Sequence, residues 1–231
     1  EIIKEYPDLF PELLLIGEPT SCQAGVAQKG CIWLKLSVSG KTSHGAEPWQ
    51  GINALEQGFG LLADLREELK REEHPVLGHS TLQITMAEGG IAPNMTPDRA
   101  KFLADIRIVP PLNEKEVLNR LECLMQKRCE VYNGGLAFVP EITNYRMPVE
   151  TGPENQWLHR LKGFIGDDAG ETGINYFTDA SILLTAWPDS PALLFGPGEP
   201  QMCHKPNEYV EISKYLEAIR VMEKFCWYIA K

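Results

Sequence analysis

The stretch LLLIGEPTSCQAGVAQKGCIWLKLSVSG, residues 13–40, contains two strands of different kinds. Its first residues, 13–16, form a continuous apolar run that Gly17 and Pro19 stop. Such a run is typical of a short strand buried on both faces in a parallel α/β sheet. Residues 31–40 instead alternate between apolar and polar side chains, which indicates a half-exposed strand of an antiparallel sheet. The stretch therefore predicts α/β material that changes into an antiparallel module.

The residues after this stretch continue the antiparallel module. Gly58 and Gly60 weaken the first of its predicted helices by about 1 kcal/mol each relative to alanine, and Asn113 and Glu116 open the second as a capping-box-like pair. The resulting β-α-β-β-α-β order is the ferredoxin-like layout, a four-stranded antiparallel sheet with two helices on one face. The ends of such a module lie close together, which suits insertion into another domain. The further predicted elements are strands at 80–88, 100–109 and 136–143 and helices at 51–73 and 113–126.

After residue 150 the pattern returns to the α/β kind. We predict a helix at 154–166, a buried strand at 192–195 and a closing helix at 211–230. The expected fold is thus an α/β portion, residues 1–26 and 144–231, interrupted by an α+β module at 27–143. On the closing helix we expect the inner side to carry Ile212, Leu216, Ile219 and Cys226.

The composition limits the partners and the compartment. The formal net charge of −10 disfavours the phosphate backbone of a nucleic acid as a partner. No apolar run approaches the ~18 residues that span a membrane. The six cysteines show no CxxC and no paired spacing, which favours reduced thiols in a cytoplasmic protein.

Two potential metal ligands each follow an apolar strand. Glu18 comes directly after the first run, and His204 follows the run that ends before Gly196. Ligands collect at the carboxyl ends of strands in open α/β sheets, and carboxylate oxygen and imidazole nitrogen bind zinc at ~2.0–2.2 Å. If the two strands are neighbours, one metal site is predicted. On spacing alone, a solvated glutamate and a satisfied polar histidine remain the alternative.

Three longer stretches resemble the M20 metallopeptidase family, the acetylornithine deacetylase and succinyl-diaminopimelate desuccinylase group. They are LLIGEPTSCQAGVAQKGCIWLKLSVSGKTSHGAEPWQGINAL (14–55), GGIAPNMTPDRAKFLADIRIVPP (89–111) and FTDASILL (177–184) followed by LLFGPGEPQMCHKPNEYVEI (193–212). The resemblance runs from about residue 13 to the end of the chain. It implies a catalytic α/β domain interrupted by a βαββαβ lid or dimerisation domain, a homodimer, and two metals bridged by water.

The resemblance also implies roles for individual residues. The metals would be Zn²⁺, with Co²⁺ or Mn²⁺ as alternatives, and the substrate an N-acyl amino acid or a small peptide. His44 would donate to the scissile carbonyl oxygen in the neighbouring subunit's active site. The remaining implied residues are the metal ligands Glu18 and His204, the substrate-holding residues Asn94 and Arg107, and the pocket-lining residues Thr178, Asp179 and Gly198.

Each residue also has a plainer interpretation without the resemblance. The segment GKTSHG around His44 is also an ordinary strand end and loop. Arg107 alternates onto the solvent-facing side of its strand, and Asn94 stands where turn residues are common.

The family pattern includes an N-terminal segment that this sequence does not match. That segment carries a His-x-Asp motif, a bridging aspartate and a Glu-Glu pair, whereas the first histidine here is His44. We therefore expect one ligand for each metal, and no activity from this chain by itself, since a catalytic zinc site normally has three protein ligands. The predicted function is an amidohydrolase that removes an acyl group from an N-acyl amino acid. The alternatives are a non-catalytic dimerisation or binding fragment and a dipeptidase of the same family.

Overall fold

The computed structural model describes residues 2–6, 8–166 and 169–230. The chain divides into two compact units, each of which is described by itself. Unit 1 contains Glu1–Lys29, His74–Gly78 and Met147–Lys231, and unit 2 contains Gly30–Glu73 and His79–Arg146. Unit 2 therefore begins and ends three residues later than the module at 27–143 that the sequence suggested, and residues 74–78 within its span belong to unit 1.

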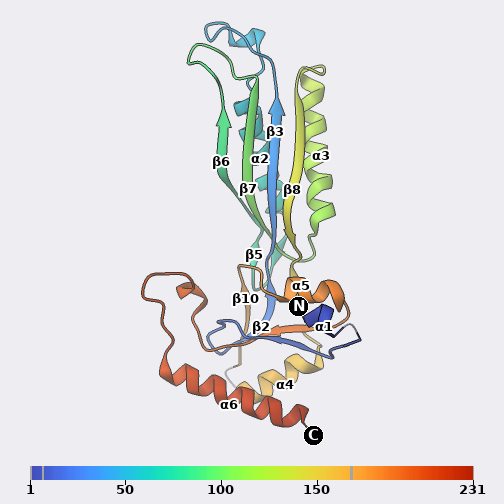
Figure 1. Cartoon of the computed structure of the whole chain (residues 1–231), viewed down its shortest axis with the longest axis vertical. Helices are drawn as coiled ribbons and strands as arrows, with labels where there is room; N and C mark the ends of the chain where they lie inside the picture. The colour runs from blue at the N-terminus through green and yellow to red at the C-terminus, as the bar shows by residue number, and fades with distance from the viewer. Residues whose placement is uncertain (1, 7, 167–168, 231) are drawn as a thin grey trace. The chain divides into compact units, whose positions relative to one another are not determined.

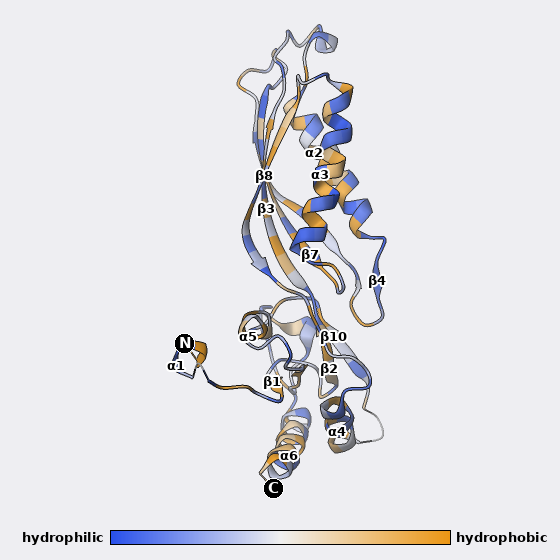
Figure 2. Cartoon of the chain, turned by 90° about the vertical axis from the view of Figure 1, so that its right-hand side faces the viewer, coloured by the Kyte–Doolittle hydropathy of each residue, from blue (hydrophilic) through white to orange (hydrophobic). Residues whose placement is uncertain are grey.

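Unit 2 is built on a four-stranded antiparallel sheet in the order β6-β7-β3-β8. Helices α2 and α3 lie on the same face of this sheet (Figures 1 and 2). Along the chain the elements follow one another as strand, helix, strand, strand, helix, strand. Their bounds are β3 (Gly30–Ser39), α2 (Ala54–Leu69), β6 (Thr81–Gly89), β7 (Arg99–Ile108), α3 (Glu114–Val131) and β8 (Ala137–Arg146).

Both helices of unit 2 begin at an asparagine cap. The Asn53 side chain accepts hydrogen bonds from the backbone N–H groups of Leu55 and Glu56 at 3.0 and 3.3 Å. Asn113 and Glu116 form the reciprocal capping box that the sequence predicted. These contacts satisfy N–H groups that have no partner within the helix, and so define where each helix starts.

The core of unit 2 lies between the sheet and its helices. The apolar side chains of β3 at Ile32, Leu34, Leu36 and Val38 are all buried, as their alternation predicted, whereas Trp33 is exposed. Phe102 of β7 belongs to the same face, and leucines of α2 cover it. The buried leucines of α2 are Leu61, Leu62, Leu65 and Leu69.

Unit 1 contains a sheet of mixed direction. Its strand order is β1-β11-β2-β10, with β9 also paired to β2. β1 runs parallel to β11 and β10 parallel to β2, but β2 is antiparallel to β11, so the parallel sheet expected for this portion is only partly realised. The strand bounds are β1 (Leu14–Ile16), β2 (Ala24–Gln28), β9 (Val149–Glu150), β10 (Glu171–Ile174) and β11 (Ala192–Leu194).

Helices α4 (Gln156–Ile165) and α6 (Ile212–Ile229) pack through aromatic rings in unit 1. The Phe225 ring lies 6.1 Å from that of Trp157 and 5.9 Å from that of Phe164. The buried side chains of α6 are Ala218, Val221 and Phe225.

The prediction of which residues lie on the inner side of α6 was therefore wrong. Ile212, Leu216 and Ile219 are 77%, 47% and 45% exposed, and Cys226 is exposed as well. The helix carries two apolar stripes, and contact with the aromatic rings of α4 selects the other one. Periodicity identifies a helix but does not choose between two stripes on it.

The remaining elements are short. Among the described helices, none combines the length and apolarity needed to cross a bilayer. Strands β4 and β5 pair with each other as a two-stranded sheet. The bounds are α1 (Ile2–Glu5), the 3₁₀ turns Pro48–Gln50 and Pro200–Met202, β4 (Glu73–His74), β5 (Gly78–His79) and α5 (Ala180–Ala186).

The two glycines of α2 provide a test of the packing. A Cβ at Gly58 would lie 2.1 Å from Phe102 Cε2, whereas one at Gly60 would meet only the guanidinium end of Arg128 at 2.9 Å. We expect Gly58→Ala to lower the free energy of unfolding by about 1–3 kcal/mol through overpacking. Gly60→Ala should leave it unchanged or raise it by up to about 1 kcal/mol, because alanine favours the helix. Urea denaturation followed by circular dichroism measures both, and equal stability of the two variants would contradict this packing.

Candidate functional site

The strands that precede Glu18 and His204 are neighbours in unit 1. Leu14 pairs with Ala192 and Ile16 with Leu194 in a parallel ladder. β1 and β11 therefore end at the same edge of the sheet, which is the condition that the sequence left open. The loop after β1 carries Glu18, and the loop after β11 carries His204.

Backbone hydrogen bonds hold these two loops together beyond the strands. Phe195 N donates to Ile16 O at 3.0 Å, and Thr20 N donates to Gly196 O at 3.2 Å. The buried Thr20 hydroxyl accepts a further bond from Gly196 N at 3.2 Å. A Cβ at Gly196 would lie only 2.5 Å from Glu18 O, so the close approach of the loops requires glycine there.

A cavity of about 590 Å³ opens between these loops and the start of α6. We call it the loop cavity. Two of the predicted site residues, Glu18 and Gly198, line it directly. Its lining also includes Pro19, Glu208, Tyr209 and Tyr215. A Cβ at Gly198 would lie 2.8 Å from that of Pro19, so this glycine too allows the loops to approach each other.

The Tyr176 hydroxyl links the Glu18 carboxylate to the segment of His204. It donates to Glu18 Oε2 at 3.2 Å and lies 3.6 Å from Cys203 Sγ. On the far side of Cys203, His204 N donates to the carboxylate of Glu208, a lining residue of the loop cavity, at 3.1 Å. The Glu18 side chain and the chain around exposed His204 therefore lie at one rim.

The electrostatics of this rim centre on Glu18. The pKa of its carboxyl is raised overall, mainly because of burial and further because of the negative charge of Asp179. The hydrogen bond from Tyr176 partly opposes this increase. Burial also raises the pKa of the Tyr176 phenol, so that this hydroxyl stays protonated and donates. A carboxylate whose charge is disfavoured by burial and by a neighbouring carboxylate would be stabilised by a cation.

Thr178 and Asp179 have different environments although they are adjacent. The buried Thr178 hydroxyl donates to Gln28 Oε1 at 2.5 Å and accepts from Ala180 N at 3.2 Å, which fixes the start of α5. Gln28 Nε2 continues the network to Ser181 Oγ at 2.7 Å. Asp179 is exposed and acts on Glu18 through its charge.

His44 and Asn94 lie together on exposed loops of unit 2. Gly45 N donates to Asn94 O at 2.7 Å, and His44 forms an antiparallel bridge with Met95. Ala46 N donates to His44 Nδ1 at 3.1 Å. Because Nδ1 accepts this bond, Nε2 is the ring nitrogen left to act as a hydrogen-bond donor.

Arg107 lies at the opposite end of the same sheet. It pairs with Cys31 at the start of β3, whereas His44 follows Ser39 at the end of that strand. At ~3.3 Å per residue, the strand between these positions corresponds to roughly 26 Å. Arg107 forms a two-point ion pair with Asp105, Nε to Oδ1 at 2.6 Å and Nη2 to Oδ2 at 2.9 Å. Unit 2 therefore does not bring Arg107 together with His44.

The described residues do not by themselves complete a metal site. Across 2–6, 8–166 and 169–230, no group of three histidine, cysteine, aspartate or glutamate side chains is placed to hold a metal ion. Glu18 and His204 supply two ligand types that zinc accepts. The residues that the structure describes thus group fewer ligands than a zinc centre normally has.

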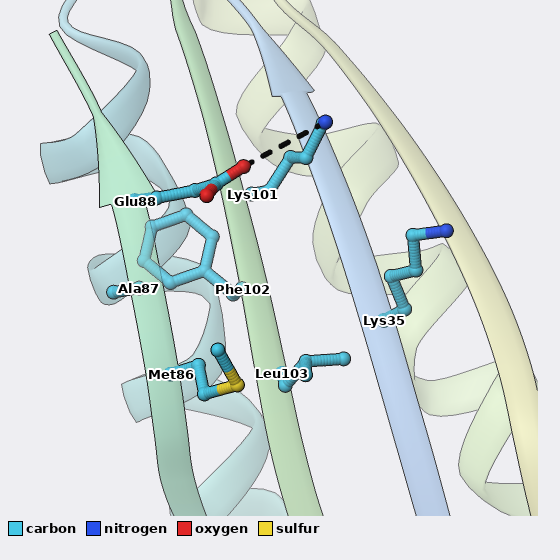
Figure 3. Close-up of a pocket in the computed structure, with 7 residues that line it drawn as sticks. All are labelled: Lys35, Met86, Ala87, Glu88, Lys101, Phe102 and Leu103. Carbon is cyan, nitrogen blue, oxygen red and sulfur yellow. Dashed lines mark ion pairs between the residues drawn. The ribbon is translucent and has the colours of Figure 1, made fainter.

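A second hollow lies on the outer face of the unit 2 sheet and has a volume of about 230 Å³ (Figure 3). Lys101 pairs with Glu88 across it at 3.6 Å, and Lys35 pairs with Glu141 at 3.0 Å. These are exposed ion pairs between neighbouring strands, and such pairs contribute little energy. None of the predicted site residues lines this hollow.

The sequence did not identify Tyr176, Gln28 or Thr20 as important for the site. Tyr176 follows β10, and Gln28 ends β2, two strands that show no clear periodicity. The available signal for Tyr176 is its position just beyond a strand end. That signal becomes usable only once β10 has been recognised.

Comparisons with known proteins agree with this architecture. Residues 26–133 match a family model described as a peptidase dimerisation domain. Over 95% of its length the chain is 30% identical to acetylornithine deacetylase from Shigella sonnei, of which it covers 58%. The chain thus spans less than two thirds of the length of this curated relative.

Solved structures share the fold at lower sequence identity. An aminopeptidase from Bacillus cereus is 17% identical with a TM-score of 0.73, and the match covers 95% of this chain and 57% of the other. An M20 family metallo-carboxypeptidase from Sulfolobus solfataricus is 16% identical with a TM-score of 0.64, covering 97% and 65%. At such identities the likeness concerns the fold.

The buried Thr178 network predicts a structural cost that can be measured without substrate. Thr178→Val should lower the free energy of unfolding by about 1–3 kcal/mol, because the Gln28 carbonyl loses its buried donor. Thr185→Val, in the same segment but exposed, should change it by less than about 0.5 kcal/mol. Thermal and urea unfolding compare the two variants. A Thr178→Val protein as stable as wild type would show that this hydroxyl is not needed for the fold.

Proposed function

We propose that this chain belongs to the M20 peptidase family and that the protein is a metal-dependent amidohydrolase that removes an acyl group from an N-acyl amino acid. One observation carries the proposal: the parallel pairing of β1 with β11 brings the loops of Glu18 and His204 to one edge of the sheet, beside the loop cavity. The 30% identity to an acetylornithine deacetylase favours the deacylase class.

We assign unit 1 to the catalytic α/β domain and unit 2 to the lid or dimerisation domain, of ferredoxin-like form. The strand order of unit 2 and the placement of both helices on one face support this assignment. Its match to a peptidase dimerisation domain supports it as well. The absence of disulfides among the six cysteines fits a reducing compartment, and we assign the protein to the cytoplasm.

Glu18 and His204 are proposed as ligands of different metal ions in a two-zinc centre, with Co²⁺ or Mn²⁺ as alternatives. The raised pKa of the Glu18 carboxyl, caused mainly by burial, fits a group that a bound cation would stabilise. When bound, zinc supplies a water whose pKa is lowered to about 7. Among the described residues, no further histidine, cysteine, aspartate or glutamate joins Glu18 and His204 in a group of three that could hold a metal ion.

Residues of unit 2 are proposed to hold the substrate. His44 Nε2–H is the donor for the developing oxyanion of the scissile carbonyl, and Ala46 keeps it in that tautomer. Asn94 lies beside His44 and would contact the same part of the substrate. The Arg107 guanidinium, whose plane is fixed by Asp105, would pair with the free carboxylate of the amino acid. In unit 1, Gly198 lines the loop cavity, and we assign Thr178 and Asp179, at the start of α5, to the substrate pocket as well.

The positions of His44 and Arg107 favour a homodimer. Because they lie at opposite ends of one sheet, roughly 26 Å apart along β3, one copy of unit 2 cannot present both to the same small substrate. A symmetric dimer resolves this, since each site would take Arg107 from its own chain and His44 from the partner.

Two alternatives have specific support. The solved structures of similar fold include an aminopeptidase and a tripeptidase, which favours a dipeptidase or small-peptide substrate. The incomplete ligand set among the described residues favours a non-catalytic dimerisation or binding fragment.

Assays of N-acetyl amino acids, N-succinyl amino acids and dipeptides separate the three functions. Absence of hydrolysis by the full-length protein with added Zn²⁺ would contradict the proposed one.

His44 is the residue whose loss should affect turnover without affecting metal. In the full-length protein, His44→Ala should lower kcat by about 10²–10³-fold, the usual effect of removing one oxyanion donor. Metal content, measured by elemental analysis, should stay at the wild-type value. His159→Ala, at another exposed histidine, should leave both unchanged. Loss of metal from the His44 variant would show that it is a ligand instead.

Mixing two inactive variants tests whether His44 acts across the dimer. Subunits carrying His44→Ala and subunits carrying Glu18→Ala should each form inactive homodimers. In mixed dimers one of the two sites has both residues intact, so random reassociation should restore about a quarter of the wild-type rate. If His44 served its own subunit, mixing would restore nothing. Sedimentation velocity confirms that the mixed sample is dimeric.

A further inference from the structure

Three polar residues connect the two ligand-bearing loops to the first turn of α6. Ser21 Oγ donates to Glu199 Oε1 at 2.6 Å, and Lys214 Nζ donates to Ser21 Oγ at 2.6 Å. Lys214 also forms an ion pair with Glu199. We call Ser21, Glu199 and Lys214 the loop cluster. Its members come from the loop after β1, the loop after β11 and α6.

We propose that the loop cluster is a positioning device that holds the segments of Glu18 and His204 at a fixed separation. This inference rests on the proposed function, because it assigns the cluster to the same site. Ser21 lies close to Glu18 in one loop, and Glu199 lies close to His204 in the other. Lys214 fastens both to a long helix that packs against α4.

Backbone strain in the first loop supports this role. Ser21 and Cys22 have φ angles of 56° and 61°, a left-handed conformation that non-glycine residues rarely adopt. Such strain costs roughly 1–3 kcal/mol per residue and persists only where the surroundings fix the chain. Here Ser21 N donates to Gly198 O at 2.8 Å, and Cys22 Sγ donates to Lys214 O at 3.3 Å. Lys214 thus holds the strained turn through both its side chain and its carbonyl.

The position of Lys214 in α6 is informative as well. It stands in the first turn of the helix, where the positive end of the macrodipole disfavours a cation. The pairing with Glu199 offsets this cost. Both side chains are only 29% exposed, so solvent screens the pair less than a fully exposed one.

The loop cluster is not arranged as a nucleophile with its base. The hydrogen bond with Glu199 raises the pKa of Lys214, so the amine stays protonated and cannot take a proton from Ser21. Hydrogen bonds from Lys214 and Ser21 lower the pKa of Glu199, which makes its carboxylate a weak base. Burial raises the pKa of the neighbouring Cys22 thiol to about 11, so this group is not a reactive thiolate.

Amide hydrogen exchange of the purified protein tests the cluster directly, without metal or substrate. In Lys214→Met, amides of residues 18–22 and 196–204 should exchange about tenfold faster than in wild type, because local opening of both loops becomes easier. Amides of β3 and β7 in unit 2 should be unaffected. Lys224→Met, at an exposed lysine of the same helix, should match wild type. Unchanged exchange in both loops of a folded Lys214→Met protein would overturn the proposal.

Three further variants separate positioning from a general loss of packing. Glu199→Gln should accelerate exchange of the same amides, and the double variant should resemble each single one, since each of them disrupts the same cluster. Lys214→Arg keeps the charge and should restore slow exchange. Additive effects of Lys214→Met and Glu199→Gln would contradict a single cluster.

Kinetics of the full-length enzyme distinguish failure of this inference from failure of the proposed function. If the wild type hydrolyses N-acyl amino acids, Lys214→Met should lower kcat and the affinity for Zn²⁺ by about 10–100-fold, with KM little changed. Hydrolysis with normal kcat and Zn²⁺ affinity in this variant would overturn the positioning role and leave the function standing. If the wild type hydrolyses none of these substrates but exchange is still faster in Lys214→Met, the proposed function is overturned. The cluster then only holds the loops.

Discussion

The parallel pairing of β1 with β11 is the constraint on which the candidate site depends. These strands are short, but together they bring residues 18 and 204 to one edge of the sheet, although most of the chain lies between them. Gly196 and Thr20 then extend the pairing into the loops. A register shift in this ladder would turn successive side chains to opposite faces and separate Glu18 from Tyr176.

Backbone strain gathers in the same two loops. Ser21 and Cys22 after β1, and His204 and Asn207 after β11, all have positive φ angles. Most of the other non-glycine backbone adopts ordinary conformations, so this concentration marks the edge where the loops meet. Strained residues persist where hydrogen bonds and packing leave the chain no alternative, and they are found mainly at functional sites. The stability of the sheet thus maintains a local geometry that the loops would not adopt alone.

Much of this fold follows from the sequence, because the elements of unit 2 have clear periodicity. The alternation of β3 and the asparagine cap of α3 predicted what the structure shows. β2 could not be predicted in this way, because its small residues are buried on every side and Gly25 packs against Leu194. β10 is likewise defined by pairing with β2 and not by its own pattern. Such strands form because of long-range contacts, and the local sequence contains no pattern that predicts those contacts.

The same distinction applies to the site. Glu18 and His204 could be singled out because each follows a recognisable strand, and the neighbouring strands then place them at one edge. Tyr176 could not be singled out, because the sequence of the strand before it shows no recognisable pattern. The loop cluster joins segments that are distant in the sequence, so their proximity is known only from the structure. Residues that carry chemistry are often identifiable by type and position. The groups that orient them act through hydrogen bonds between distant segments, so they emerge only when those segments are seen together.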